Sequence, residues 1–249
     1  MISATIITKN EEKNIDRCLA SLFWADEIIV VDSGSTDKTL KICEKYQVCI
    51  IETDWLGFGK TKQLAVNNAK YDWIFSIDAD EEVSPRLAEK ITDLKLNKFD
   101  DHSGFKVKRE SFYLGKKIRF SGWQNDNPLR LFNKNFGSFN DREVHEMVVM
   151  NEQSLAFISE PIIHYPYESL FHHVNKINHY TDLTSINYSK KGKKSSIAFS
   201  LLSSFYKFFK TYIIRLGFLD GKEGFVLSIM SSYSNLLKYL KLWQINKNK

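Results

Sequence analysis

Residues 72–82 read Asp-Trp-Ile-Phe-Ser-Ile-Asp-Ala-Asp-Glu-Glu, an apolar run that ends in a cluster of carboxylates. The apolar part predicts a buried strand, and the carboxylates follow where that strand leaves its sheet. Asp78 and Asp80 flank one residue, so a tight turn can direct both toward one point. They would repel each other unless a cation lay between them. Because oxygen ligands favour Mg²⁺ or Mn²⁺, the segment predicts a metal site; a solvated acidic loop that caps the next helix is the alternative.

The segments before this strand alternate between strand and helix patterns. Strands are expected at residues 4–8, 27–32 and 48–52, with helices at 12–23, 36–46 and 59–69. Ser84 and Pro85 then open a further helix as its N-cap and first residue. This alternation is typical of an α/β fold with a parallel sheet covered on both faces. In such sheets ligands bind beyond the carboxyl ends of the strands.

The pattern changes after residue 100. From 101 to 165, short β-like runs such as 104–109 and 129–132 are separated by Gly, Asn and Asp, which indicates a mixed extension of the sheet that builds the second half of a cleft. From Phe171 onward the pattern is helical. We therefore expect an α/β domain at residues 1–188 and a basic helical tail at 189–249.

Length and composition fit this division. The chain has 249 residues and is 43% hydrophobic, enough for one large domain and an appendage. Cys18, Cys43 and Cys49 form no metal-binding spacing and are expected to be reduced, buried thiols, as in the cytosol. Residues 1–8 predict a first strand rather than a signal peptide. The sequence contains no uncharged apolar stretch of about 18 residues, so no membrane-spanning helix is expected.

The net charge of +5 is unevenly distributed. Residues 189–249 contain 12 Lys and Arg against 2 Asp and Glu, a net +10, which leaves 23 against 28, or −5, for residues 1–188. The tail is also rich in Phe, Tyr, Leu and Ile. This composition favours a tail that binds an anionic membrane surface over a tail that is simply exposed to solvent. No nucleic-acid-binding motif accompanies the positive charge, so no nucleic acid partner is expected.

Polar residues also follow the other strands. Asp32 ends the second strand, and its carboxylate can accept the N–H of a uracil ring. Because Ser35 or Thr36 can cap the next helix, Asp32 is expected to be available to a ligand. Lys60, Lys62 and Gln63 begin a helix, where a phosphate or nucleotide contact is favoured; ordinary surface lysines are the alternative.

Three of these segments together resemble the inverting family 2 glycosyltransferases of the GT-A fold. They are Thr8-Lys9-Asn10-Glu11-Glu12, Val30-Val31-Asp32-Ser33-Gly34-Ser35-Thr36-Asp37 and Asp78-Ala79-Asp80-Glu81. Later segments are similar to the branch that builds the inner core of bacterial lipopolysaccharide, many of whose members are described as β-glucosyltransferases. Those segments are Gly122-Trp123, Arg130-Leu131-Phe132, Val144-His145-Glu146 and Gly217-Phe218-Leu219-Asp220-Gly221. The resemblance covers nearly the whole chain.

The resemblance implies a role for each matching residue. Asp80, with Asp78, would hold Mg²⁺ or Mn²⁺ on the donor diphosphate, and His164 would reach the same ion; a satisfied, half-buried histidine is the alternative for His164. Asp32 would bind the nucleobase. The remaining donor-binding candidates are Thr8, Asn10, Glu11, Ser33, Lys62, Gln63 and Asp78.

The acceptor side is expected to carry a general base. Inversion in one displacement requires the acceptor hydroxyl to lose a proton, and the resemblance implies Glu146 as the carboxylate that takes it. Asp141, Glu143 and Asp126 compete for this role, and Glu146 could instead be paired with Arg142 or Arg130. Trp123, Asp126 and His145 are the candidate acceptor contacts. Core packing is the alternative for Trp123.

The tail contains two amphipathic segments. Residues 197–219 and 229–243 place apolar side chains at three- and four-residue spacing, and Lys190, Lys191, Lys193 and Lys194 precede them. Such segments can lie in a membrane interface. The alternative is that they pack on the catalytic domain or on a partner chain. In the second case the tail would join copies of the chain into a homo-oligomer.

These features predict a peripheral enzyme on the inner, cytoplasmic face of the plasma membrane. It would transfer a hexose, with UDP-glucose the favoured donor from the resemblance, to lipopolysaccharide core or another lipid-linked glycan. A protein or capsular polymer is an alternative acceptor, and a non-catalytic nucleotide-sugar or glycan-binding module is an alternative class. A dehydrogenase is disfavoured because no Gly-x-Gly-x-x-Gly follows the first strand, and a P-loop enzyme because Gly57-Phe58-Gly59-Lys60 lacks the spacing.

Overall fold

The computed structural model describes residues 1–140, 146–151 and 154–247. The chain divides into two compact units. The first comprises Met1–Arg109 and Asp126–His164, and the second comprises Glu110–Asn125 and Tyr165–Lys249. The three changes of unit fall after residues 109, 125 and 164. The expected boundary after residue 188 lies inside a helix of the second unit, Leu170–Lys190, and the division into domains at 1–188 and 189–249 stays a prediction.

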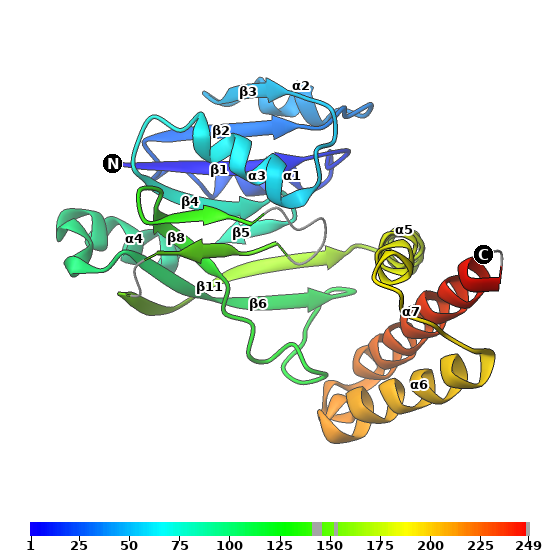
Figure 1. Cartoon of the computed structure of the whole chain (residues 1–249). Coiled ribbons are helices and arrows are strands. Elements are labelled where there is room, and N and C mark those ends of the chain that lie inside the picture. Colours follow the sequence, from blue (N-terminus) through cyan, green and yellow to red (C-terminus); the bar gives the residue numbers. More distant parts are fainter. Residues whose placement is uncertain (141–145, 152–153, 248–249) are drawn as a thin grey trace. The chain divides into compact units, whose positions relative to one another are not determined.

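The first unit is built on a mixed sheet (Figure 1). Its parallel part has the order β3-β2-β1-β4, from β1 (Ile2–Thr8), β2 (Glu27–Asp32), β3 (Cys49–Glu52) and β4 (Trp73–Asp78). These four strands lie within a residue or two of the predicted ones. The sheet continues as β8-β6-β11-β5, from β5 (Glu81–Val83), β6 (Gly104–Tyr113), β8 (Leu129–Asn133) and β11 (Leu155–Tyr167). Pairing of β8 with β4 is antiparallel, which confirms the mixed extension.

Helices cover both faces of this sheet. Ile15 and Leu19 of α1 (Ile15–Ala20) and Ile91 of α4 (Pro85–Leu96) share one core cluster with the strands, whereas Ala65 and Val66 of α3 (Phe58–Asn67) pack in a second cluster. Alternation along the strands separates the two clusters, since Val30 faces the first and its neighbours Ile29 and Val31 face the second. The predicted two-sided covering is confirmed.

Two of the predicted helices are shorter in the structure. Helix α1 ends at Ala20, and α2 (Thr39–Cys43) does not include the preceding residues 36–38. The residues before both helices are instead held in loops by side-chain hydrogen bonds, as described below. The start of α4 agrees with the prediction, because Ser84 Oγ accepts a hydrogen bond from the Leu87 N–H at 3.3 Å and Pro85 is the first helical residue. A 3₁₀ turn, η1 (Lys98–Asp101), follows α4.

A small second sheet pairs β9 (Gly137–Phe139) with β10 (Val148–Met150). Phe139 packs in the same core cluster as helix α3. The cysteines are free, as expected, but only Cys18 and Cys43 are buried. Cys49 is exposed, which corrects the expectation that all three are buried.

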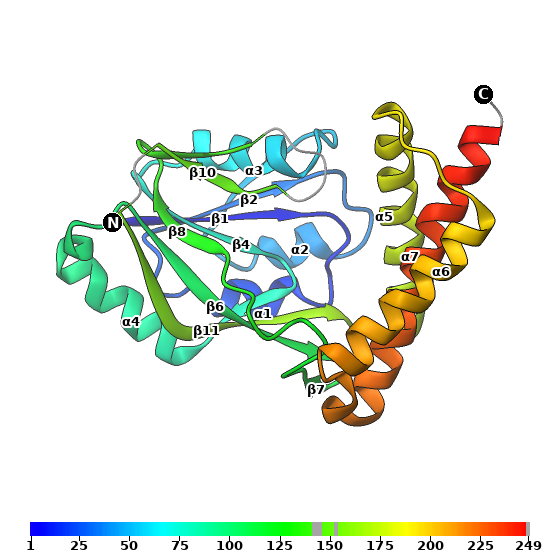
Figure 2. The same ribbon diagram turned by 60° about the horizontal axis from the view of Figure 1, so that its bottom comes forward.

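The second unit is mainly helical (Figure 2). It contains α5 (Leu170–Lys190), α6 (Ile197–Phe209), a π-helical turn η2 (Lys210–Ile214), a 3₁₀ turn η3 (Gly217–Asp220) and α7 (Gly221–Lys247). The long helix α7 packs against both α5 and α6. Within the described part of the chain, none of the helices has the length and apolarity needed to cross a bilayer.

Asp220 connects the start of α7 to the hairpin of β6 and β7 (Lys116–Lys117). This buried carboxylate accepts hydrogen bonds from the Arg119 and Phe120 N–H groups at 2.9 and 3.0 Å and from Ser121 Oγ at 2.9 Å. Lys116 Nζ donates to the Asp220 carbonyl at 2.6 Å. The motif that contains Asp220 therefore has a structural role in the second unit.

Candidate active site

The carboxyl ends of the central strands meet at one edge of the sheet in the first unit. Thr8 lies opposite Asp32 in the register of β1 and β2, and Ile7 lies opposite Asp78 in the register of β1 and β4. The Ser33 N–H donates to the Thr8 carbonyl at 3.0 Å. The expected convergence of Thr8, Asp32, Ser33 and Asp78 is therefore what the strand pairing produces.

Asp32 holds the loop that follows its strand. Its Oδ1 accepts hydrogen bonds from the Gly34 and Ser35 N–H groups at 2.9 and 2.8 Å, and its Oδ2 accepts one from Ser35 Oγ at 2.5 Å. The expected N-cap by Ser35 or Thr36 is wrong, because α2 starts at Thr39 and Asp37 Oδ1 accepts the Thr39 N–H at 2.9 Å. Asp32 is thus fully buried and engaged with its own loop.

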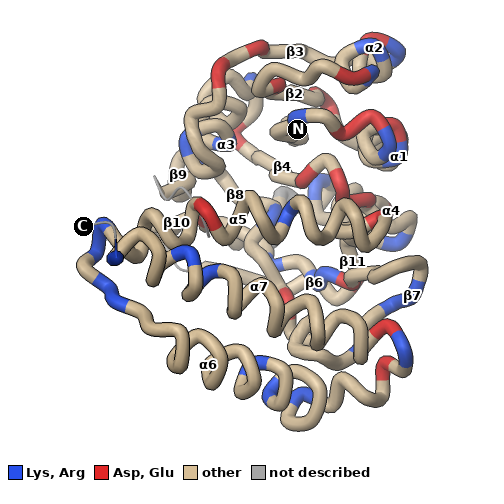
Figure 3. Tube along the Cα trace, turned by 90° about the vertical axis from the view of Figure 1, so that its right-hand side faces the viewer, with Lys and Arg blue, Asp and Glu red and all other residues tan. Residues whose placement is uncertain are grey.

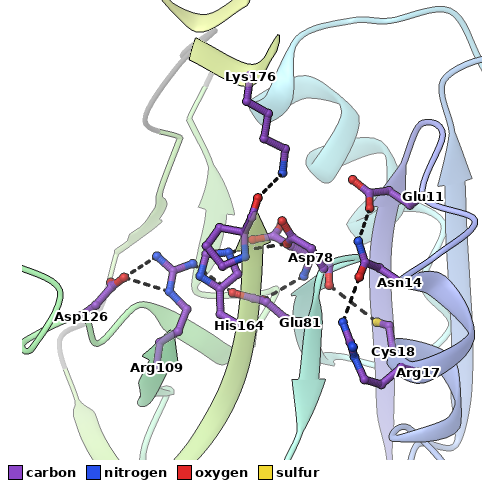
Figure 4. Close-up of polar contacts among 12 residues, drawn as sticks. Glu11, Asn14, Arg17, Cys18, Asp78, Glu81, Arg109, Asp126, His164 and Lys176 are labelled. Carbon is purple, nitrogen blue, oxygen red and sulfur yellow. Dashed lines mark hydrogen bonds and ion pairs between the residues drawn. The ribbon is translucent and has the colours of Figure 1, made fainter. Parts of the chain in front are cut away.

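Asn10 and Glu11 connect the loop after β1 to the loop after β2. Asn10, which has a left-handed backbone with φ 57°, accepts the Thr36 N–H on Oδ1 at 2.8 Å and donates its own N–H to Ser35 Oγ at 2.8 Å. The Glu11 N–H donates to Thr39 Oγ1 at 2.8 Å, and Glu11 Oε2 accepts from Asn14 at 2.8 Å (Figure 4). Asn10 and Glu11, both candidates for binding the sugar donor, therefore hold the loops at the strand ends in place.

Two hydroxyl groups at this edge are buried without a hydrogen-bond partner among the described residues. They are Thr8 Oγ1 and Ser33 Oγ, on residues that are 5% and 3% exposed. Leaving a buried polar group unsatisfied costs about 1–3 kcal/mol. A bound ligand that supplies hydrogen bonds at this position would remove that cost.

Asp78 is held by two buried cations. Lys62 Nζ lies 2.7 Å from its Oδ1, and Arg130 donates to its Oδ2 at 2.7 Å. Burial opposes ionisation, but Arg130 and Lys62 outweigh it and hold the pKa of Asp78 well below its usual range. Protein cations thus neutralise Asp78, and the sharing of one metal ion by Asp78 and Asp80 stays a prediction.

Lys62 also holds the expected general base. Its Nζ lies 2.8 Å from Glu146 Oε1, so one ammonium bridges Asp78 and Glu146. Burial works against the charged form, yet the attraction of Asp78 and Glu146 prevails over the repulsion of Arg130, and the pKa of Lys62 is raised. Lys62 is therefore not the surface lysine considered as an alternative, and the partner of Glu146 is Lys62 rather than Arg130.

Arg130, Glu81 and Arg109 extend this network. The fully buried Glu81 accepts from Arg130 at 2.5 Å and from Arg109 at 2.9 Å through Oε1, and from the Asp78 N–H at 3.0 Å through Oε2. Arg109 also binds Asp126 Oδ2 through Nε at 2.9 Å and through a terminal nitrogen at 2.5 Å (Figure 4). Asp126, a candidate for both acceptor binding and base, is thus an ion-pair partner of Arg109.

Asp80, in the turn between β4 and β5, and His164, on β11, come together. His164 on β11 lies opposite Glu81 on β5, and its Nε2 is 3.7 Å from Asp80 Oδ1. Bonds of roughly 2.1 Å from one divalent ion place two ligands about 3–4 Å apart, so this pair fits a shared ion. Among the described residues, no three His, Cys, Asp or Glu side chains form a metal cluster.

The other candidates have different surroundings. Both ends of the Gln63 amide are used, since Oε1 accepts the Phe139 N–H at 2.8 Å and Nε2 donates to Asn67 at 2.7 Å. Trp123 belongs to the second unit and packs against Tyr113 and Tyr167, with ring centroids 6.2 and 6.4 Å away, which favours the core-packing alternative. His145, Asp141, Glu143 and Arg142 lie outside the described residues.

Arg109, Arg130 and Glu81 were not singled out as site residues from the sequence. One signal was present: Arg130 interrupts the apolar run Leu129–Phe132, and an arginine on a central strand needs a buried partner. Its Nε is a further buried donor without a partner among the described residues.

Comparison with known proteins places this site in a family. Residues 3–150 match the sequence profile described as glycosyl transferase family 2. An uncharacterized glycosyltransferase of Rickettsia bellii is 33% identical over 98% of this chain and 87% of its own length. The chain belongs to glycosyl transferase family 2. This glycosyltransferase is also 28% identical, over 98% of its length and 92% of the relative's, to the lipopolysaccharide core biosynthesis glycosyltransferase LpsC of Rhizobium meliloti.

The fold agrees with this assignment. The structure of S. aureus TarS residues 1–349 in complex with UDP superimposes with a TM-score of 0.51 at 15% identity, covering 99% of this chain and 91% of that chain. The similarity confirms the expected GT-A fold of this family 2 glycosyltransferase.

Proposed function

We propose that this glycosyltransferase transfers a hexose from a UDP-sugar, with UDP-glucose favoured, to lipopolysaccharide core or another lipid-linked glycan. The observation that carries the donor assignment is the pair of buried, unsatisfied hydroxyls of Thr8 and Ser33 beside Asp32. A nucleoside offers the donors and acceptors that these groups lack. Two further facts support the assignment: TarS, which shares the fold, binds UDP and UDP-GlcNAc, and LpsC acts in lipopolysaccharide core biosynthesis.

Asp80 and His164 would hold a divalent Mg²⁺ or Mn²⁺ ion. When bound, the ion would neutralise charge on the departing diphosphate. Asp78, fixed by Lys62 and Arg130, would act differently. It would keep these two cations ionised and in place at the strand edge, where they add positive potential beside the diphosphate.

Glu146 would remove the proton of the acceptor hydroxyl as that hydroxyl attacks the sugar. A carboxylate that acts as base must be ionised and correctly placed. Lys62 serves the second requirement, since its ammonium fixes Oε1 at 2.8 Å, which leaves Oε2 for the acceptor. Asp126 is the weaker candidate because Arg109 binds it through two nitrogens.

The enzyme would work on the inner face of the plasma membrane, on a lipid-linked acceptor. A protein or capsular polymer remains the alternative acceptor, and a non-catalytic nucleotide-sugar-binding module the alternative class. The module is disfavoured by the Lys62–Glu146 pair, since binding alone does not need an oriented carboxylate.

The test is turnover by purified protein over a panel of UDP- and GDP-sugars with Mn²⁺, with EDTA and the Asp80→Ala variant as controls. Metal-dependent turnover of a UDP-sugar supports the proposal. Glu146→Gln should lower turnover by roughly 10²–10⁴-fold with unchanged donor affinity in calorimetry. Donor binding without any transfer by the wild type, whatever the acceptor, would favour the non-catalytic module. No binding of any nucleotide sugar would refute the donor assignment.

A further inference from the structure

Helix α6 packs in the second unit through its polar side. Ser204 Oγ donates to the Ser232 carbonyl at 2.8 Å, Ser232 Oγ donates to the Ser204 carbonyl at 2.8 Å, and Asn235 donates to Ser203 Oγ at 2.7 Å. Ser200 and Ser204 are 0% and 7% exposed. The contact between α6 and α7 thus includes these small, hydrogen-bonded residues, together with the aromatic pairs Phe199–Tyr239 and Phe208–Phe225.

The large apolar side chains of α6 point outward. Leu202 and Phe205 are 71% and 72% exposed, and Leu201, Tyr206 and Phe209 are exposed as well. Helical spacing brings these five residues into one stripe. The stripe continues beyond the helix through Ile213, Ile214, Leu216, Phe218 and Leu219, all exposed. We refer to Leu201–Phe209 and Ile213–Leu219 together as the α6 face.

The orientation of α6, with its apolar side outward, is opposite to that of an amphipathic helix on the surface of a water-soluble protein. An amphipathic surface helix of a water-soluble protein turns its apolar stripe to the core and its polar residues to solvent, and contiguous apolar patches on such proteins are small. Small residues between helices with large apolar residues outside are typical of helices in lipid. The packing of α6 therefore indicates an apolar environment on its outer side.

The charges near the α6 face favour an anionic bilayer over a second copy of the chain. Residues 195–219 contain no Asp or Glu but include Lys207, Lys210 and Arg215, and Lys193 and Lys194 precede them; Figure 3 shows no acidic residue along α6. Burial, Arg215 and Lys210 all lower the pKa of Lys207, which indicates a local excess of positive charge. Two copies joined through this face would bring like charges together, whereas anionic headgroups complement them.

The length of α6 decides how it can meet a bilayer. Thirteen residues span about 20 Å at 1.5 Å per residue, less than the hydrocarbon thickness of about 30 Å. Helices of this kind lie in the plane of the interface with the apolar side among the acyl chains. We propose that the α6 face inserts into the surface of an anionic phospholipid bilayer, with Leu202 and Phe205 deepest. The inference deepens the proposed function, and rests on it for the presence of a lipid-linked acceptor.

The test is flotation of the full-length protein with vesicles of phosphatidylcholine, with and without phosphatidylglycerol. The wild type should float with the anionic vesicles, and less so at high salt. The double variant Leu202→Ser/Phe205→Ser should lower the partition coefficient at least about tenfold, because each inserted side chain adds to the transfer free energy. Phe23→Ser is the matched control, since Phe23 is 81% exposed but lies outside the α6 face; it should float like the wild type.

A second measurement reports insertion directly. In a Cys49→Ser background, whose other cysteines are buried, an environment-sensitive fluorophore at Leu202→Cys should shift to the blue on anionic vesicles, and one at Phe23→Cys should not. The proposal is overturned if the double variant floats like the wild type, or if the label at position 202 does not respond. It is also overturned if the wild type ignores vesicles but forms a dimer that the double variant loses. Flotation needs no turnover, so its failure is distinct from failure of the donor assignment, which calorimetry with UDP-sugars tests.

Discussion

The ammonium of Lys62 lies 2.8 Å from the carboxylate of Glu146, and the same ammonium lies 2.7 Å from Asp78. One buried cation thus connects a strand-end carboxylate of the donor side with the carboxylate expected to act as base. Lys62 and Glu146 are 84 positions apart in sequence. We therefore expect Lys62 to contribute both to stability and to transfer.

Replacing Lys62 should therefore destabilise the protein and impair transfer together. Lys62→Met keeps the length of the side chain but removes its charge. Asp78 then keeps only Arg130 as an ion-pair partner, and Glu146 loses its ion pair with Lys62. Removing one partner of a buried ion pair costs about 3–5 kcal/mol, which urea unfolding followed by circular dichroism can measure. Lys60→Met, an exposed position on the same helix, is the control and should change the unfolding free energy by less than about 0.5 kcal/mol. Equal effects of the two substitutions would contradict the buried bridge.

The depressed pKa of Asp78 predicts a specific acid sensitivity. Because Arg130 and Lys62 hold the folded-state pKa well below its usual value, the ionised carboxylate stabilises the fold above the unfolded-state pKa of about 3.9. That stabilisation is lost as pH falls from about 4 toward the folded-state pKa. The unfolding free energy of the wild type should fall more steeply below pH 4 than that of Asp78→Asn, which lacks the titrating group. Parallel pH profiles for the two proteins would show that Asp78 is not the responsible carboxylate.

The separation of 3.7 Å between Asp80 Oδ1 and His164 Nε2 predicts that both residues govern metal affinity. Asp80→Ala and His164→Ala should each weaken Mn²⁺ binding in the presence of UDP at least about tenfold, measured by calorimetry without an acceptor. Asp93→Ala, an exposed carboxylate on α4, should leave the affinity unchanged. If His164→Ala bound Mn²⁺ as tightly as the wild type, the histidine would be only a neighbour of Asp80 and not a metal ligand.

The sequence carries most of the parallel half of the sheet and less of the site. Apolar runs that end in polar clusters locate β1, β2 and β4, and parallel pairing then brings Thr8, Asp32 and Asp78 to one edge. Arg109, Arg130 and Glu81 escape such reasoning because β6 and β8 join the sheet by antiparallel, non-local pairing. No local pattern states which carboxylate a distant arginine will meet.

The early helices and the tail show the same limit. Periodicity predicted α1 and α2 to be longer than they are. Both helices start late because hydrogen bonds that involve Asn10, Asp32 and Thr39 fix the backbone before each helix in a loop. In the tail, the spacing of apolar residues predicted the helix α6 but not which side faces outward. That choice depends on the serines of α7, which lie about 30 residues further along the chain.

The close approach of η3 to α7 gives a final prediction. A Cβ added to Gly224 would lie 2.0 Å from the Gly217 carbonyl oxygen and 2.7 Å from Asp220 Cβ, closer than real side chains come. Gly224→Ala gains helix propensity of about 1 kcal/mol at most, which the clash should exceed by displacing η3 and the hydrogen bonds that Asp220 makes to residues 119–121. We expect a net loss of about 1–3 kcal/mol in unfolding free energy. Gly115→Ala, where a Cβ meets nothing within 4 Å and only a φ of 85° opposes it, separates the two causes. A larger loss for Gly224→Ala than for Gly115→Ala would attribute the effect to close packing rather than to backbone strain, and a stabilised Gly224→Ala would contradict the close approach.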